Sequence, residues 1–103
     1  MKLIVVMGIA EYSRDVRKIL VKQNIPIFSE MEMEGYRVDS DKSVEDNWFA
    51  DRDRGIYSRV YLAFVDSEQA DHLMNAVHEY NDEHKDHGMH PVRAFQLNVE
   101  KSL

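Results

Sequence analysis

The pattern of apolar residues alternates along this chain between strand-like and helical segments. The order of these segments constrains the fold more than any other feature. Residues 2–9 form an apolar, β-branched run that is typical of a central strand covered on both faces. Residues 13–24 then carry apolar side chains at helical spacing, and Asn24 and Pro26 end the predicted helix. Its buried face is predicted to consist of Val16, Ile19, Leu20 and Gln23.

The rest of the chain holds two more strands, a second helix and a last strand. Residues 27–36 and 59–65 alternate in polarity, which predicts two strands. Asp66 and Gln69 form a capping-box pattern at the start of the second helix, and Pro91 forbids its continuation. Residues 92–99 then predict the final strand. The predicted core positions of the second helix are Ala70, Leu73, Met74, Val77 and either Tyr80 or Asn81.

This β-α-β-β-α-β order predicts the fold class. Residues 1–103 are expected to form a single α+β domain of the ferredoxin-like kind, with an antiparallel four-stranded sheet and both helices on one face. One set of alternating strand residues is assigned to the helix-covered face: Leu3, Val5, Met7, Met31, Met33, Val60, Leu62, Phe64, Phe95, Leu97 and Val99.

The opposite face of the predicted sheet has no helix to cover it. It would carry Ile4, Val6, Phe28, Tyr61, Ala63, Val65, Ala94, Gln96 and Asn98. Such a face is too apolar to be left in water as one patch, so we predict a homo-oligomer in which the sheets meet. An error of one residue in strand phase would exchange the two faces without removing the patch.

Composition and charge exclude several classes of protein. The chain has no cysteine, which excludes disulfides and thiolate sites. A net charge of −6 argues against nucleic-acid binding and against docking on anionic membranes. The apolar start of the chain is short for a signal peptide, and no stretch approaches a membrane span. We therefore expect a cytoplasmic protein without membrane insertion.

The stretch from Gly35 to Ser58 is the longest predicted connection, and it is crowded with charge. Connections of this length in compact domains are usually functional or disordered. Trp48, the single tryptophan, could anchor a partner protein. Arg52 and Arg54 could bind an anionic ligand while Trp48 stacks on a ring. Trp48 and its neighbour Phe49 could instead pack back onto the domain, and the sequence leaves these alternatives open.

Three histidines follow the second predicted helix at a spacing of three residues. They are His84, His87 and His90, with Asp82, Glu83 and Asp86 among them. Imidazole and carboxylate groups together suit zinc, nickel or copper, so we predict a candidate metal site. The alternative is a solvated polar turn whose side chains complement the helix dipole.

Three segments carry a resemblance to a known family. MKLIVVMGIAEYSRDVRKILVKQNI, EMEMEGYRV and RVYLAFVDSEQADHLMNAVHEY together resemble the PII-like superfamily of signalling proteins over nearly the whole chain. The resemblance implies a non-enzymatic homotrimer that binds small effectors, often adenine nucleotides, in clefts between subunits. It also implies a partner protein, commonly a transporter or an enzyme, that is engaged by a mobile T-loop. Gly35 falls where that loop begins, so residues 35–58 are its expected analogue.

The resemblance is weakest after the second helix. Nucleotide-binding members place a Gly- and Lys-rich phosphate loop there, whereas this chain reads NDEHKDHGMHPVR, with Gly88 as its one glycine. Phosphate cradles use glycines, and neighbouring carboxylates would repel a phosphate. The cofactor is therefore left open between an adenine nucleotide and a divalent transition metal.

Two other functions are compatible with the same fold. One is a heavy-metal-binding or metal-tolerance module that uses the three histidines. The other is a small dimeric enzyme, such as a monooxygenase, with a cleft between helices and sheet. The sequence shows no Ser/His/Asp or Cys/His arrangement, so no catalytic residue is predicted.

Overall fold

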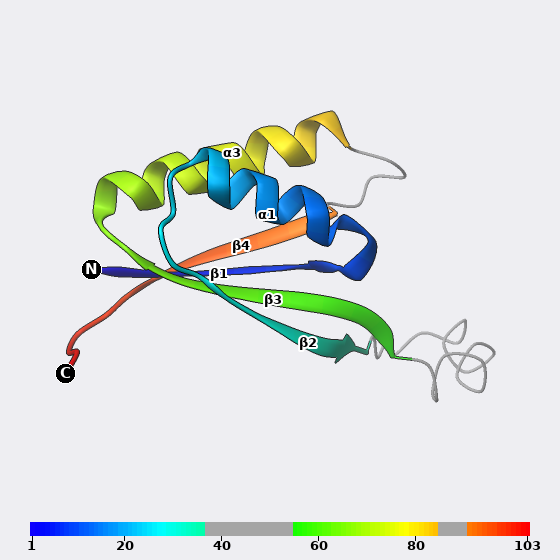
Figure 1. Cartoon of the computed structure of the whole chain (residues 1–103), viewed down its shortest axis with the longest axis horizontal. Coiled ribbons are helices and arrows are strands. Elements are labelled where there is room, and N and C mark those ends of the chain that lie inside the picture. Colours follow the sequence, from blue (N-terminus) through cyan, green and yellow to red (C-terminus); the bar gives the residue numbers. More distant parts are fainter. Residues whose placement is uncertain (37–54, 85–90) are drawn as a thin grey trace, which may run out of the picture.

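A computed structural model describes residues 1–36, 55–84 and 91–103. In chain order the elements are β1 (Lys2–Ile9), the 3-10 turn η1 (Ala10–Tyr12), α1 (Ser13–Lys22), β2 (Ser29–Gly35), β3 (Ile56–Val65), α3 (Ser67–Glu83) and β4 (Val92–Asn98). The strands form one antiparallel sheet in the order β2-β3-β1-β4. Both helices lie on one side of it (Figure 1), which confirms the predicted α+β ferredoxin-like fold.

The ends of α1 and α3 follow from local chemistry. Asn24 adopts a left-handed φ of 59°, which asparagine tolerates better than most residues and which ends α1. At the start of α3, the carboxylate of Asp66 accepts from the amide of Gln69, and the Gln69 side chain accepts from the amide of Asp66. The predicted capping box is therefore confirmed. The predicted core positions Ala70, Leu73, Val77 and Tyr80 are buried.

The pairing of β2 with β3 runs further than the sequence indicated. β2 begins at Ser29 rather than at residue 27, and Ile27 is exposed. β3 begins at Ile56, opposite Gly35, rather than at residue 59. The two strands therefore continue as a paired ribbon into the stretch that was predicted to be wholly a connection.

The helices cover the face of the sheet that was predicted to be open. The buried core contains Ile4, Val6, Tyr61, Ala63 and Val65 from the sheet, packed against Val16, Leu20, Leu73 and Val77 from the helices. The assignment of Leu3, Val5, Leu62 and Phe64 to the helix side was wrong. Both sets are apolar, so the pattern along the strands did not determine which face the helices cover, and a shift of one residue in phase exchanges the two faces.

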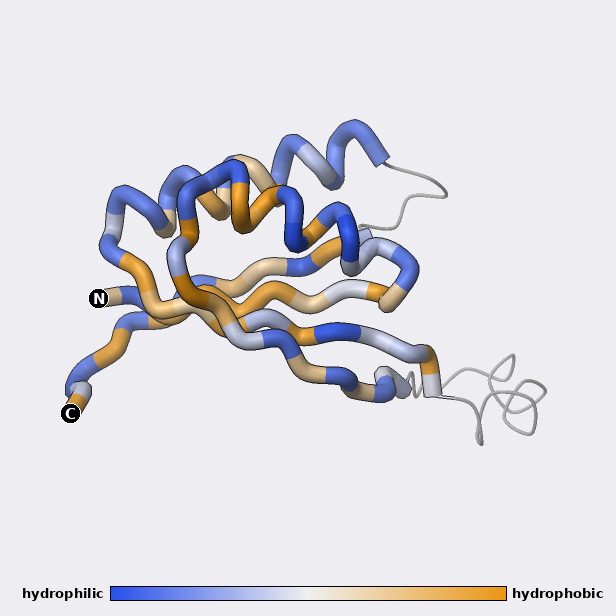
Figure 2. Tube along the Cα trace, viewed as in Figure 1, coloured by the Kyte–Doolittle hydropathy of each residue, from blue (hydrophilic) through white to orange (hydrophobic). Residues whose placement is uncertain are grey.

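The open face of the sheet is apolar along its middle, with Arg93 beside Met7 on the edge strand β4 and Ser29 beside Leu62 on the edge strand β2. Its rows follow from the strand register: Leu97, Leu3 and Phe64 in one row, Phe95, Val5 and Leu62 in the next, and Met7, Val60 and Met31 beyond them. Phe64 is 59% exposed and Leu97 is 49% exposed. Figure 2 shows the hydrophobic colouring along β1 and β3, in contrast to the hydrophilic outer turns of both helices.

Candidate functional site

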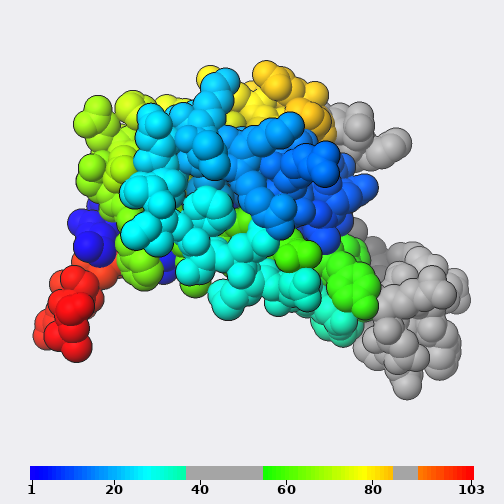
Figure 3. Space-filling model, in the orientation of Figure 1, coloured from blue at the N-terminus to red at the C-terminus, as the bar shows by residue number. Residues whose placement is uncertain are grey.

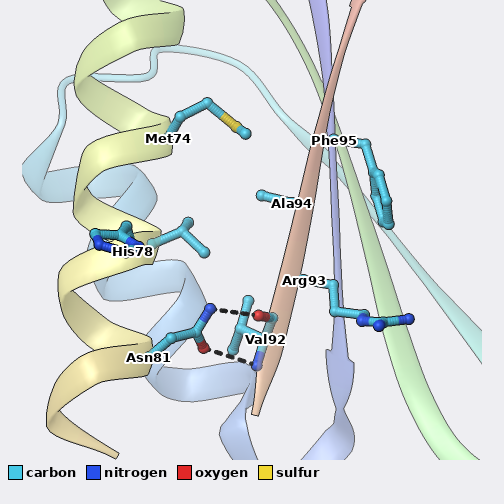
Figure 4. A pocket seen from close by; sticks show the side chains of 8 residues that line it. Met74, His78, Asn81, Val92, Arg93, Ala94 and Phe95 are labelled. Carbon is cyan, nitrogen blue, oxygen red and sulfur yellow. Dashed lines mark hydrogen bonds between the residues drawn. The ribbon is translucent and has the colours of Figure 1, made fainter. Parts of the chain in front are cut away.

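A groove of about 340 Å³ runs between α3 and the edge strand β4. Its apolar wall is formed by Met74, Val77 and Ala94. His78 lies along the helix side of the groove, and Arg93 and Phe95 lie on the far side of β4 (Figure 4). The groove therefore combines an apolar wall with the imidazole of His78, while the Arg93 guanidinium points away from it on the other side of β4.

Asn81 closes one end of this groove. Its side-chain amide donates to the carbonyl oxygen of Val92 at 2.7 Å, and its amide oxygen accepts from the Val92 backbone N–H at 3.1 Å (Figure 4). The backbone groups of Val92 thus face away from β1. Because these directions alternate along a strand, the backbone groups of Ala94 and Gln96 also point to the free edge. β4 consequently offers unpaired strand positions beside the groove.

The two stems of the 35–58 connection meet closely at the end of the sheet. The Tyr36 hydroxyl donates to Glu34 Oε2 at 2.6 Å. A Cβ at Gly55 would lie 2.7 Å from the Cβ of Glu34 and 2.9 Å from Tyr36 Cζ, so a larger residue would force the stem apart. The predicted site residue Gly35 ends β2 opposite Ile56. The structure therefore fixes where the connection begins and ends.

The other site residues predicted in this connection lie outside the described residues. They are Trp48, Arg52 and Arg54. Their proposed roles stay predictions.

The predicted histidine cluster is described at one residue, His84. Its Nδ1 lies 2.9 Å from the carbonyl oxygen of Tyr80, and its ring stacks on the Tyr80 ring with centroids 4.0 Å apart. Since a carbonyl can only accept, Nδ1 carries the proton of the neutral ring, and Nε2 is the nitrogen with a free lone pair. His87, Gly88 and His90 lie outside the described residues. Within the described ranges, no group of three or more potential metal ligands occurs.

Two buried tyrosines, Tyr80 and Tyr61, donate hydrogen bonds to residues at the start of α1. The Tyr80 hydroxyl donates to Asp15 Oδ2 at 2.7 Å, and the edge of Tyr12 meets the Tyr80 ring. Burial, reinforced by Asp15, raises the pKa of Tyr80 well above its ordinary value. Burial likewise raises the pKa of Tyr61 to about 12. Both hydroxyls therefore keep their protons at neutral pH.

An ion-pair network that the sequence analysis missed joins α1 to β2 and β3. Arg17 donates two hydrogen bonds of 2.8 Å to the carboxylate of Glu30. Arg59 reaches the same carboxylate at 3.4 Å and Glu32 at 3.2 Å. The hydrogen bond from Arg17 is the main reason why the pKa of Glu30 is lowered. Opposite charges facing each other across β2 and β3 were the available signal, because Glu32 pairs directly with Arg59.

Comparisons with known proteins identify the fold. No family model and no curated protein matches the sequence. Two solved structures are similar to the chain, each over 95% of its length and with a TM-score of 0.64. One is a protein of Thermus thermophilus described as a PII-like signaling protein, with 14% identity and 85% of that chain covered. The other is CPII from Thiomonas intermedia, a nitrogen regulatory PII-like protein in its apo form, with 9% identity and 87% covered.

These similarities show that the chain has the PII-like form of the ferredoxin-like fold, as the resemblance in sequence implied. In the part of the chain that the structure describes, neither helix has the length and apolar character that crossing a membrane requires.

Proposed function

We propose that this chain is a non-enzymatic regulatory protein. It forms a homotrimer, binds a small effector in clefts between subunits and acts on a partner protein through the 35–58 connection. The observation that carries this proposal is the fold itself: a PII-like sheet whose β2 and β3 ribbon supports the connection at one end. Two of the solved structures with a similar fold are described as PII-like signalling or regulatory proteins.

The open sheet face supports the homotrimer. Leucine, methionine, valine and phenylalanine side chains form one continuous apolar surface there, and Phe64 and Phe95 are each about half exposed. Monomeric proteins seldom leave so large an apolar patch in water.

The groove between α3 and β4 supports an effector site between subunits. It opens at the edge of the sheet, where a neighbouring subunit of a trimer would supply the second wall. Arg93, on the other side of the edge strand β4, adds a positive charge beside this opening, which suits an anionic effector such as an adenine nucleotide.

The close stems at Glu34, Tyr36 and Gly55 support the partner-binding role of the connection. They hold its two ends together at a point away from the helices (Figure 1), where a partner protein, such as a transporter or an enzyme, would have access. Residues on loops that a rigid scaffold positions commonly carry binding functions.

Mass and ligand response test the proposal. Light scattering should give about three times the chain mass of 12.1 kDa. A thermal-shift panel of ATP, ADP and AMP should raise the melting temperature with at least one nucleotide, and Arg93→Ala should reduce that shift. A monomer or dimer would contradict the trimer, and a flat response to all three nucleotides would contradict the nucleotide site.

The geometry of His84 favours a second candidate function, binding of a divalent transition metal with His87 and His90. The hydrogen bond from Nδ1 to the Tyr80 carbonyl orients the ring and leaves Nε2 as the ligand nitrogen, as in many metal sites. Calorimetric titration with zinc or nickel should show binding that His84→Ala and His87→Ala both weaken. His72 is an exposed histidine on α3, and His72→Ala is the matched control. Unchanged isotherms for the two test variants would rule out this site.

A further inference from the structure

The outer surfaces of the two helices carry opposite charges. α1 holds four cations, Arg14, Arg17, Lys18 and Lys22, and one carboxylate, Asp15. α3 holds five carboxylates and neither Lys nor Arg: Glu68, Asp71, Glu79, Asp82 and Glu83. The helices contact each other in one layer and run in opposite directions (Figure 1). The helix layer is therefore basic along one side and acidic along the other.

Three of the α1 cations form a basic ridge, defined as Arg14, Lys18 and Lys22. They stand at intervals of four residues, so they share one face, opposite the buried Val16 and Leu20. At 1.5 Å per residue the ridge is about 12 Å long. All three side chains are exposed, and none forms an ion pair within the described residues.

The fourth cation of α1, Arg17, differs from the three residues of the basic ridge because it has a carboxylate partner. Arg17 points toward β2 and is neutralised by Glu30 through two hydrogen bonds. In the ranges that the structure describes, the basic ridge has no such carboxylate, although the chain as a whole has a net charge of −6. The described part of the chain therefore supplies no counter-charge to the basic ridge.

α3 carries an acidic ridge, defined as Glu68, Asp71, Glu79 and Asp82. At 100° per residue these positions fall on one side of the helix, away from the buried Leu73 and Val77. At 1.5 Å per residue the ridge is about 21 Å long, which exceeds the length of the basic ridge. Both helices lie at the surface of the molecule, with no other described element over them (Figure 3).

We propose that a second copy of this chain docks on the helix layer, with the basic ridge of each copy against the acidic ridge of the other. A two-fold axis along the helices and between them produces this arrangement, and each contact then occurs twice. A partner of one charge sign would satisfy one ridge and be repelled by the other. A second copy satisfies both, which is the charge complementarity that selects it.

This contact is separate from the proposed trimer. The helix layer lies on the side of the sheet opposite the open apolar face, so both contacts can form together. Among the described residues of α1, Val21 is the large apolar side chain that lies exposed beside the basic ridge, at 67%. The contact consequently rests on exposed charges, whose attraction salt screens over about 10 Å at 0.1 M.

Salt therefore has a predicted direction of effect. Lowering NaCl from about 200 mM to about 20 mM should strengthen the association roughly tenfold or more, because each exposed ion pair is weak and readily screened. An apolar contact would respond in the opposite direction. Sedimentation velocity over a concentration series measures both: the unit present at high salt, which reports the trimer, and its further association at low salt, which reports the helix-layer contact.

Charge-swap variants test the pairing itself. Arg14→Glu, Lys18→Glu and Lys22→Glu together make both ridges acidic. Glu68→Lys, Asp71→Lys and Glu79→Lys together make both basic, since Asp82 is then the one carboxylate left in the second ridge. Each triple variant alone should lose the low-salt association, and an equimolar mixture of the two should recover it. The chain with all six substitutions should also associate, and it keeps the parent net charge of −6. That chain controls for charge-driven effects that do not depend on pairing.

The outcomes decide the proposal. Absence of low-salt association in the parent chain overturns it, as does a triple variant that associates like the parent while circular dichroism shows a native fold. Failure of the mixture to associate, although each variant is folded, also overturns it. A mass at high salt other than three copies contradicts the trimer and leaves the test of the helix layer intact.

Discussion

The two faces of the sheet are both apolar, yet they are built from different side chains. The covered face uses Ile4, Val6, Ala63 and Val65, which fit closely beneath the helices, and the large Tyr61, whose hydroxyl reaches the carbonyl of Ser13 at 3.4 Å. Within the described residues, every buried side-chain nitrogen or oxygen has a hydrogen-bond partner. The covered face therefore forms a complete core within one chain.

The open face uses longer and more adaptable side chains. Leu, Met and Phe residues predominate there, and they pack well against surfaces of varied shape. The difference teaches that an apolar strand pattern serves two purposes in this chain. One face stabilises the fold, and the other is available for association.

The largest expected effect separates association from folding. Leu62 lies near the middle of the open face, opposite Val5 and Ser29. Leu62→Glu would bury a charge in the proposed trimer, so we expect the mass to fall from three copies to one while circular dichroism stays native. Asn75→Glu adds the same charge on the exposed surface of α3 and should leave the mass unchanged. A trimeric Leu62→Glu variant would show that the open face is not the interface.

A second pair of substitutions compares the two faces in the dissociated Leu62→Glu background. Leu73 is fully buried on the side of α3 that packs against the covered face, and Leu73→Ala should lower the free energy of unfolding by about 3 kcal/mol. Leu97 is 49% exposed on the open face, and Leu97→Ala should cost less than about 0.5 kcal/mol. Urea unfolding at equal protein concentration measures both. Equal losses would mean that the two faces are equivalent in the single chain.

The smallest expected effect lies at the polar margin of the covered face. Glu30→Gln removes the carboxylate that Arg17 and Arg59 share, and it should lower the free energy of unfolding at pH 7 by about 1 kcal/mol. The pKa of Glu30 in the folded chain lies below its ordinary value of 4.5, so this contribution is present above that pH. It is lost as the pH falls below 4.5 and through the lower folded value.

The difference between parent and Glu30→Gln should accordingly shrink below pH 4.5. Urea titrations from neutral to acid pH measure it. Glu32→Gln is the control, since the Glu32 side chain is 79% exposed, and its effect should be smaller at every pH. A difference that stayed constant with pH would exclude the ion pair as its source.

The order of elements could be read from the sequence because each element has a distinct period and clear ends. The start of α3 is marked by the hydrogen bonds between Asp66 and Gln69. The end of α1 is marked by the backbone restrictions of Asn24 and Pro26. The phase of the sheet could not be read in this way. Successive residues of β1, such as Val5 and Val6, are equally apolar, and only the packing of the helices decides which one is buried.

The candidate site was less predictable, since its groups come together through tertiary structure. The groove joins Met74 and His78 on α3 to Arg93 and Phe95 on β4, and no local spacing links these pairs. Tyr80 was expected in the core, but its hydrogen bond to Asp15 depends on the contact between the two helices. His84 was identified from spacing alone, and the structure adds the orientation of its ring.

The two hydrogen bonds between Asn81 and Val92 determine where the length of this chain can change. It ties the last turn of α3 to the first residue of β4, so the two ends of the 85–90 segment are fixed by groups outside that segment. Closing a longer loop between fixed ends costs little, about 0.6 kcal/mol for each doubling of length. Residues 85–90 can therefore be lengthened or exchanged for another sequence while Asn81 and Val92 still join α3 to β4.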